Sequence, residues 1–416
     1  TISAIQTTGV EKLFLSNFQT NATPAVTTVA TDLMSGLTTV GLSASSATGD
    51  TAFTGLNGIV DAEMRNGAAD LTLTYGAAAV VGTADTQKLA VSNLSAGTFT
   101  ADGIETLAIT SGTVKSTLAA VVSDKLKTVT VSGDKDLTIT AAVDFVAGTN
   151  GDTTIDATID ASTFTGKLSV VASDTNDIEV KGGSGNDTIA MAAALTKTDK
   201  IDGGAGDDTL TMTAATLTTQ FAGVSNIETV AFTAGVADAT MDVSKLSAGV
   251  TTVQMDLSDG TDGGSADILG TISNLDGQAV LLKHTVANAA DTDQSDGVAF
   301  TITNKLDTAA DSVSITLDAI GVTSIANNST SDFGIDVLDV ANFETVNLNS
   351  KKSATVTANE VRGLTDSSAT TLNLTGDADL TITQSGTKLT KLDAAGLDGK
   401  LAVTLGANKV SVTGTA

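Results

Sequence analysis

Two nonapeptides that share one glycine–aspartate pattern lie in the middle of this 416-residue chain. Residues 182–190 read GGSGNDTIA and residues 203–211 read GGAGDDTLT, and both fit G-G-x-G-x-D-x-U-x, where U is a large apolar residue. The glycines permit a tight turn with positive φ, and the last three residues begin a short strand. The copies start 21 residues apart, against roughly 18 for one regular coil, so an insert of about three residues lies within 192–199. The pattern predicts two turns stacked one above the other on successive coils.

Stacked turns of this kind predict a calcium site. Their carbonyl and carboxylate oxygens would form a ring of the hard ligands that calcium prefers. The alternative is a pair of ordinary glycine turns without metal. Asp177 and Asp202 precede the two turns, and either acid completes the coordination or caps the stack. The candidate calcium-site residues of this segment are Asp177, Gly182, Gly183, Ser184, Gly185, Asn186, Asp187, Asp202, Gly203, Gly204, Ala205, Gly206, Asp207 and Asp208.

Two further acidic loops are weaker candidates for calcium binding. Asp259 and Asp262 lie among glycines, and Asp291, Asp293 and Asp296 precede another glycine. Loop oxygens of this kind suit calcium, but ordinary polar loops have the same composition.

The composition excludes several classes of function. The net charge is −27, from 48 acidic and 21 basic residues, so the chain repels phosphate backbones and we expect no nucleic-acid partner. Cysteine is absent, which removes disulfides, thiolate catalysis and thiolate metal sites. No apolar run approaches the roughly 18 residues that a membrane span needs. We expect the chain to have no membrane span.

Short strands with alternating apolar and polar residues dominate the sequence. Examples are LTLT at 71–74, TVTV at 128–131 and LTIT at 380–383. Aromatic residues make up only 3% of the chain, so small and β-branched residues must form the core, which suits thin layers of strands. Two short segments, Ala30–Met34 and Asn359–Leu364, are expected to form a helical turn or two.

Loose internal repeats indicate a solenoid. A glutamate followed by a strand recurs at Glu11, Glu105, Glu228 and Glu344, and the block 126–140 matches 370–383 closely. Such a block buries little apolar area alone and must stack on its neighbours. We predict an all-β chain of elongated β-solenoid or parallel β-helix-like modules, with small antiparallel sandwiches as the alternative. The expected divisions are a β module at 1–101, a β-repeat module at 102–176, the calcium-binding β-roll at 177–212, a β module with acidic loops at 213–340 and a β-repeat module at 341–416.

These features resemble two known groups of proteins. The two turns look like the calcium-binding RTX repeat of proteins exported by type I secretion, over roughly residues 177–212. The glutamate-led strands and repeat blocks are similar to the surface-layer proteins of Gram-negative bacteria, of the Caulobacter and Campylobacter kind. The resemblance implies a secreted, cell-surface protein that forms a calcium-dependent two-dimensional lattice and binds lipopolysaccharide through an N-terminal region. We expect this chain to be the lattice-forming part of a longer protein that continues past Ala416 and has its lipopolysaccharide-binding region elsewhere.

The sequence gives no indication of an enzyme. Its single histidine, His284, is expected in a strand, and the motifs H-E-x-x-H and G-x-S-x-G are missing. The prediction is therefore a structural protein that self-assembles through calcium-bridged contacts between copies. The alternative is an adhesin or stalk segment of a type I-secreted surface protein, in which similar modules present a binding tip.

Overall fold

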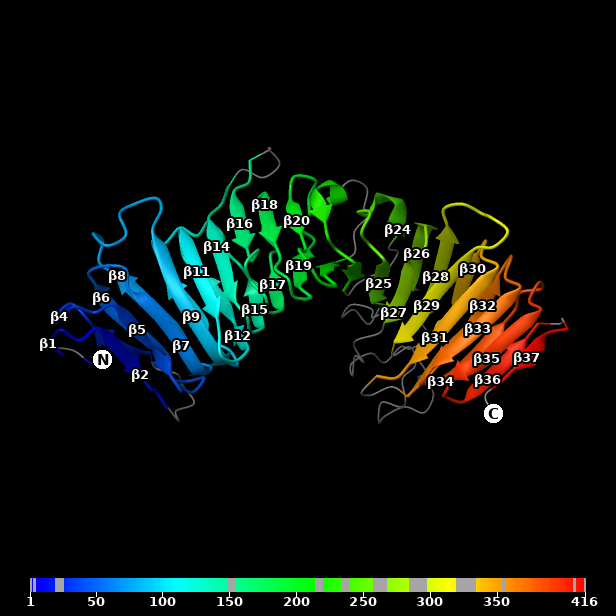
Figure 1. Ribbon diagram of the computed structural model, residues 1–416, viewed down its shortest axis with the longest axis horizontal. Helices are drawn as coiled ribbons and strands as arrows, with labels where there is room; N and C mark the ends of the chain where they lie inside the picture. Colours follow the sequence, from blue (N-terminus) through cyan, green and yellow to red (C-terminus); the bar gives the residue numbers. More distant parts are fainter. Residues whose placement is uncertain are drawn as a thin grey trace. The chain divides into compact units, whose positions relative to one another are not determined.

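The computed structural model describes residues 2, 5–18, 26–148, 154–213, 220–233, 240–256, 268–283, 298–318, 334–353, 357–406 and 409–414. They form two compact units, unit 1 (Thr1–Leu210 and Gln220–Ile227) and unit 2 (Thr211–Thr219 and Glu228–Ala416). Within each unit the chain winds as a β-solenoid, with consecutive strands alternating between sheets (Figure 1). The paired strands of the described segments all run parallel to their neighbours, as the register of Val180 in β18 with Ile201 in β20 illustrates. The predicted solenoid is confirmed, and these segments contain no antiparallel sandwich.

Unit 1 is built from three groups of strands and one small pair. Sheet I has the order β2 (Lys12–Leu15), β5 (Thr39–Ser43), β7 (Asp61–Gly67), β9 (Thr86–Leu94), β11 (Thr106–Ser111), β14 (Thr128–Gly133), β16 (Ala157–Asp160), β18 (Ile178–Lys181), β20 (Lys200–Asp202), β22 (Val224–Ser225). Sheet II has the order β3 (Thr27–Ala30), β6 (Thr51–Leu56), β8 (Leu71–Tyr75), β10 (Thr98–Ala101), β13 (Ala120–Val122). The strands that we call sheet III are β12 (Ser116–Leu118), β15 (Leu137–Ala142), β17 (Leu168–Val171), β19 (Thr188–Ala192) and β21 (Thr209–Met212), of which β21 has its first two residues in unit 1 and its last two in unit 2. The small pair is β1 (Thr7–Thr8) with β4 (Met34–Ser35).

Unit 2 is also a solenoid of parallel strands, and it consists of two groups of strands. The first has the order β23 (Thr229–Phe232), β25 (Thr252–Asp256), β27 (Ala279–Lys283), β29 (Ser312–Asp318), β31 (Thr345–Lys351), β33 (Thr371–Gly376), β35 (Lys391–Leu397), β37 (Ser411–Thr413). The second has the order β24 (Thr240–Asp242), β26 (Ile268–Leu275), β28 (Val298–Asn304), β30 (Val337–Ala341), β32 (Ala358–Asp366), β34 (Asp379–Gln384), β36 (Leu401–Leu405).

The core of each unit is a set of aliphatic ladders between the sheets. In sheet I, Ile159, Val180 and Ile201 stand in register on consecutive strands, and each is fully buried. The chain covers 21 residues from one of these positions to the next. Because side chains at matched positions of parallel strands point the same way, alternate apolar residues build a continuous thin core, which is mainly aliphatic and includes single phenylalanines such as Phe53 and Phe99.

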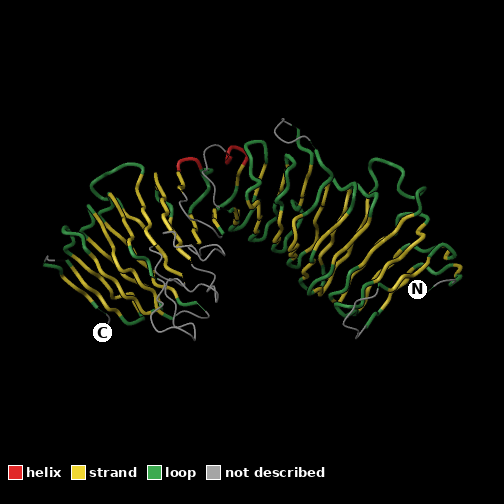
Figure 2. The backbone as a smooth tube through the Cα atoms, turned by 180° about the vertical axis from the view of Figure 1, so that it is seen from behind, coloured by secondary structure: helices red, strands yellow, loops and turns green. Residues whose placement is uncertain are grey.

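The prediction of two short helices is wrong. Ala30 ends β3 and Met34 begins β4, so a turn separates two strands there. Asn359 and Leu364 both lie in β32, where the side chain of Asn359 donates to Ser350 Oγ of a neighbouring strand at 2.9 Å. Pairing with adjacent coils overrides the weak local helical pattern. The helices of the described segments are two 3-10 turns, η1 (Gln220–Gly223) and η2 (Val243–Lys245), drawn red in Figure 2. None of the helices in these segments is long and apolar enough to cross a membrane.

The matching blocks 126–140 and 370–383 form the same local structure. Each is a strand, a turn and a second strand, and the turn contains Gly133 with φ 110° or Gly376 with φ 112°. Asp136 accepts the backbone N–H of Lys167 at 3.0 Å, and Asp379 accepts that of Lys400 at 2.8 Å, one coil further on. The recurring aspartate therefore bonds one coil to the next at the same corner.

The recurring glutamates also occupy one structural position. The carbonyl oxygen of Glu105 accepts the N–H groups of Lys127 and Thr128 in the next coil, and that of Glu344 accepts those of Thr370 and Thr371. The carboxylate of Glu105 reaches back to the N–H of Asp85 at 2.8 Å, and that of Glu344 to the N–H of Asp311 at 2.9 Å. One residue thus contacts the coil on either side.

We predict that Gly133→Ala destabilises unit 1 by about 2–4 kcal/mol. An added Cβ would lie 1.9 Å from the carbonyl oxygen of Ser111 in the preceding coil, and the positive φ of 110° disfavours alanine. Urea unfolding followed by circular dichroism measures the loss. Gly112→Ala is the control, since nothing lies within 4 Å of its added Cβ. Equal stability of the two variants would contradict the close packing of these corners.

Candidate functional site: stacked aspartate turns

Four aspartates in unit 1 each stand directly before a strand, two of them before strands of sheet I and two before strands of sheet III. Asp177, Asp187, Asp199 and Asp208 immediately precede β18, β19, β20 and β21. All four are at most 1% exposed. Carboxylates are rarely buried this completely unless hydrogen bonds or cations compensate the loss of water. These positions are therefore the candidate functional site.

The two predicted turns lie one above the other. The backbone N–H of Asp187 donates to Asp208 Oδ1 at 2.6 Å, and the N–H of Thr209 donates to the carbonyl oxygen of Asp187 at 2.9 Å. The N–H of Ala205 donates to the carbonyl oxygen of Gly183 at 3.0 Å. Successive turns are therefore joined through both backbone and carboxylate, as the 21-residue spacing predicts.

Glycine is required in these turns because the coils approach each other closely. A Cβ on Gly182 would lie 2.0 Å from the carbonyl oxygen of Gly203, and one on Gly204 would lie 2.2 Å from that of Gly183. Gly204 also has φ 95°, a region that side chains disfavour. Both sequence copies therefore supply glycine where a neighbouring backbone oxygen occupies the place of a side chain.

A third turn, which the nonapeptide pattern does not reveal, lies beneath the first. The N–H of Ser184 donates to the carbonyl oxygen of Phe164 at 3.0 Å, and a Cβ on Gly185 would lie 2.4 Å from the oxygen of Gly166. Asp187 Oδ1 accepts the N–H of Leu168 at 2.8 Å in that same lower coil. Residues 160–167 thus adopt a compatible turn with a different sequence.

Asp199 is the site residue that sequence reasoning missed. Its Oδ1 accepts the N–H of Ile178 in the preceding coil at 2.9 Å, and its Oδ2 accepts the N–H of Thr196 at 2.7 Å. Asp187 bonds in the same way to Leu168 and Gly183, at 2.8 and 2.7 Å. The position of Asp199 in the sequence could have revealed it, because an aspartate stands directly before each of these four strands. Only Asp187 and Asp208 belong to glycine-rich turns.

The remaining predicted residues of the segment lie around these aspartates. Asp202 Oδ1 accepts the N–H of Gly204 at 3.1 Å and the side-chain amide of Asn226 at 2.7 Å. Asp177 accepts the hydroxyl of Thr198. Asn186 Oδ1 accepts the N–H of Asp207 at 3.2 Å. The exposed members are Ser184, Asn186, Ala205, Gly206 and Asp207.

Burial raises the pKa of the Asp187 carboxyl, and the N–H groups of Leu168 and Gly183 and the charge of Lys167 oppose the rise. Burial likewise raises the pKa of Asp199, against its hydrogen bonds from Ile178 and Thr196. The ionised forms are therefore incompletely compensated by the protein itself. An external cation beside these carboxylates would lower their energy.

The oxygen atoms of the turns suit calcium in kind. Asp187 Oδ2 and the carbonyl oxygen of Gly203 lie 2.7 and 2.0 Å from the position of a Cβ on Gly182. Asp208 Oδ2 and the carbonyl oxygen of Asn226 stand in the same way around Gly203, at 2.7 and 1.9 Å. A carboxylate–carbonyl pair therefore repeats on successive coils, and calcium prefers such oxygens. No three His, Cys, Asp or Glu side chains gather as a metal-binding group in the described part of the chain, so an ion here would depend on carbonyl ligands.

The weaker acidic loops and the histidine cannot be placed. Asp259, Asp262, Asp291, Asp293, Asp296 and His284 lie outside the described residues. Their assignment as calcium ligands, or as a strand residue for the histidine, stays a prediction.

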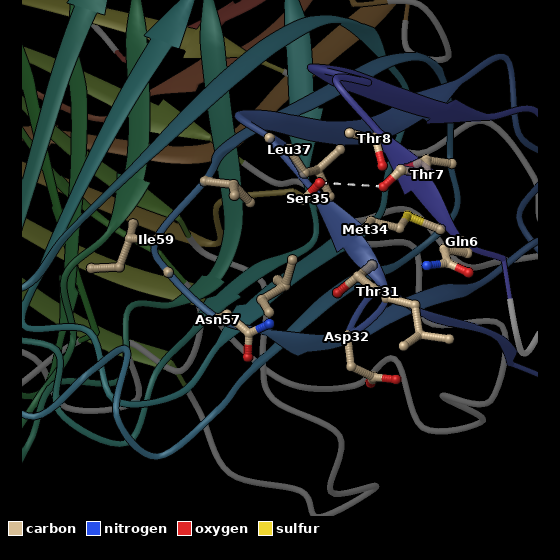
Figure 3. Close-up of a pocket in the computed structure, with 15 residues that line it drawn as sticks. Gln6, Thr7, Thr8, Thr31, Asp32, Met34, Ser35, Leu37, Asn57 and Ile59 are labelled. Atoms are coloured by element: carbon tan, nitrogen blue, oxygen red, sulfur yellow. Dashed lines mark hydrogen bonds between the residues drawn. The ribbon is translucent and has the colours of Figure 1, made fainter.

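A pocket of about 510 Å³ lies near the start of unit 1 (Figure 3). Hydroxyl and amide groups of Thr7, Thr31, Ser35 and Asn57 line it together with the carboxylate of Asp32, and Ser35 Oγ donates to the carbonyl oxygen of Thr7 at 3.4 Å. Its lining contains no Lys, Arg or His. The pocket therefore offers no cation to a phosphate group.

Asp366 in unit 2 is a half-buried acid away from the turns. Burial raises the pKa of its carboxyl, while the side chain of Gln384, which donates to Oδ2 at 2.8 Å, opposes the rise. Since the pKa is higher in the folded state than in the unfolded state, the resulting stabilisation is present in acid. It is lost as the pH rises through the folded-state pKa.

We expect Asp366→Asn to raise the melting temperature of unit 2 at pH 7 by about 1–4 °C, with no gain at pH 3. Calorimetry of the full chain at the two pH values measures the difference. Asp393→Asn serves as the control, because the N–H of Ala395 and the side chain of Lys391 lower the pKa of the Asp393 carboxyl. An Asp366→Asn variant that follows the control at both pH values would contradict the assigned effect of burial.

Comparison with known proteins gives no match: no family model, no curated protein and no solved structure is similar to this chain at a significant level. The fold and the site therefore define this molecule only as a parallel β-solenoid with stacked, buried aspartate turns.

Proposed function

We propose that this protein is a secreted structural component of a bacterial surface layer that binds calcium at its stacked turns and assembles into a two-dimensional lattice. The observation that carries the proposal is the carboxylate–carbonyl pair that repeats on successive coils at Asp187 and Asp208. Both carboxylates lie buried in a chain of net charge −27, and a divalent cation beside them would offset their negative charge.

The mechanism is linkage between ion binding and folding. Calcium that binds only the stacked turns stabilises them by about 2.7 kcal/mol at a concentration 100 times its Kd. At low calcium the buried acids oppose closure of the turns, which suits export through a type I system. Outside the cell, calcium closes the turns and bridges acidic surfaces of neighbouring copies.

The solenoid fold supports a structural role because each coil contacts mainly its neighbours and exposes broad sheet faces. We infer no enzymatic activity, since the sequence has one histidine and neither of the hydrolase motifs considered above. The pocket near the start of unit 1 is no candidate for the expected lipopolysaccharide contact. The pocket beside Thr7 lacks the basic side chains that phosphate groups require.

We predict that Asp187→Asn together with Asp208→Asn abolishes the calcium-dependent rise in melting temperature. Amides keep the size of the side chains and remove the charge that attracts the ion. Calorimetry in calcium and in chelator measures the difference for each protein. The matched control is Asp134→Asn with Asp144→Asn, which removes the same charge at exposed positions. A calcium response that survives in the turn variant would overturn the assigned site.

The lattice itself is tested by electron microscopy of the purified chain. We expect ordered sheets in millimolar-range calcium and dispersed particles in chelator, because like charges keep copies apart without the ion. Monomers that bind a host or sugar ligand in calcium would favour the adhesin or stalk instead.

A further inference from the structure

The two sides of unit 1 differ sharply in their content of charged residues. The ten strands of sheets II and III contain no Asp, Glu, Lys or Arg. The strands of sheet I, which alternate with them along the chain, carry ten charged residues: Lys12, Asp61, Glu63, Arg65, Lys88, Asp160, Glu179, Lys181, Lys200 and Asp202. In a chain of net charge −27, a sheet side without charged residues needs an explanation.

Sheets II and III form one continuous side of the unit. Sheet II ends on β13 and sheet III begins on β12, and these strands belong to the single segment 116–122. Between them, the N–H of Ala119 donates to the carbonyl oxygen of Gly97 at 2.9 Å, and its own carbonyl oxygen accepts the N–H of Ala141 at 2.8 Å. The coils on either side of this segment are therefore bonded through one residue.

Small side chains cover the outside of these sheets. Strand alternation buries residues such as Phe53, Leu71 and Phe99, so their neighbours face outward. In sheet II the outward residues stand in register as one row: Thr28, Ala52, Thr72, Thr100 and Val122. In sheet III the corresponding row is Thr117, Thr138, Ser169 and Thr188. We call this outer surface the neutral face.

We propose that the neutral face is the surface through which two copies of this chain pack directly against each other. The inference rests on the proposed function, since a lattice requires contacts between copies. A contact through sheet I would have to pair or desolvate the five basic and five acidic side chains of its strands, whereas the strands of the neutral face bring no charge into a contact. Threonine supplies methyl groups for packing and hydroxyl groups for hydrogen bonds across the contact.

The size of the neutral face suits a specific contact. Nine coils spaced about 4.8 Å apart, with about four residues each at roughly 3.3 Å, cover roughly 570 Å². Two such faces bury roughly 1,100 Å², which clears the roughly 1,000 Å² expected of a biological interface. A face that packs on its own copy closes as a dimer, so lattice growth needs a second contact, which the calcium-bridged acidic surfaces supply.

The test places charge on one face at a time. Thr72→Glu with Thr100→Glu puts two carboxylates on neighbouring strands of the neutral face. Thr106→Glu with Thr128→Glu puts the same pair on neighbouring strands of sheet I and is the matched control. Circular dichroism and melting temperature confirm that both variants fold, and Thr72→Glu alone replaces the pair if it does not. Sedimentation in calcium and in chelator measures self-association, and electron microscopy records sheets.

We expect the neutral-face variant to self-associate at least about tenfold more weakly than wild type in both conditions, and the control to stay within about twofold. Equal effects of the two variants, or wild-type protein that stays monomeric throughout, would overturn the neutral face as an interface. Sheets that form in calcium regardless of the neutral-face substitutions would overturn it while leaving the lattice proposal standing. Dimers that are weakened by the neutral-face substitutions, in a protein that forms no sheets in calcium, would support the neutral face as an interface and contradict the lattice proposal.

Discussion

The bonding of each coil to the next is the interaction on which the rest of this structure depends. Parallel strands stand in register from coil to coil, so every corner of one coil meets the same corner of its neighbour. The close approach of carbonyl oxygens to Gly133, Gly182 and Gly376 follows directly from this register. Because coils touch mainly their neighbours, a thin core of Val, Ile and Leu is sufficient, and a chain with few aromatic residues and no cysteine can still fold.

Acidic residues serve this stacking as acceptors as well as providing surface charge. Glu105, Asp136 and Asp187 each accept a backbone N–H from an adjacent coil, at positions separated along the chain. A carboxylate at a corner therefore accepts a hydrogen bond from a backbone N–H group that has no partner in the strand ladder. The arrangement carries an electrostatic cost where the carboxylates are fully buried, as at Asp187 and Asp199. That cost is the physical link between the stacking of the coils and the proposed dependence on calcium.

Unit 1 separates two kinds of surface chemistry. The buried aspartate turns combine charge with backbone oxygens, and the neutral face of sheets II and III excludes charged residues from its strands. If copies join through the neutral face and through calcium-bridged acidic surfaces, the first contact does not depend on the ion and the second one does. A lattice built from both contacts would therefore respond to calcium while keeping a small unit intact in its absence.

The sequence by itself determined the class of fold and the position of the two turns. Alternating strands, the matching blocks 126–140 and 370–383 and the 21-residue spacing of the glycine turns are local patterns, and the register confirms what they predict. Local patterns failed at Asn359–Leu364, where strand pairing outweighs a weak helical tendency. They also missed Asp199 and the turn at 160–167, because these match the motif in position rather than in letters. Only the tertiary structure decided which residues of different coils meet. It also decided that the uncharged strands share one side of unit 1. Both depend on how many residues each coil contains before the chain returns to register.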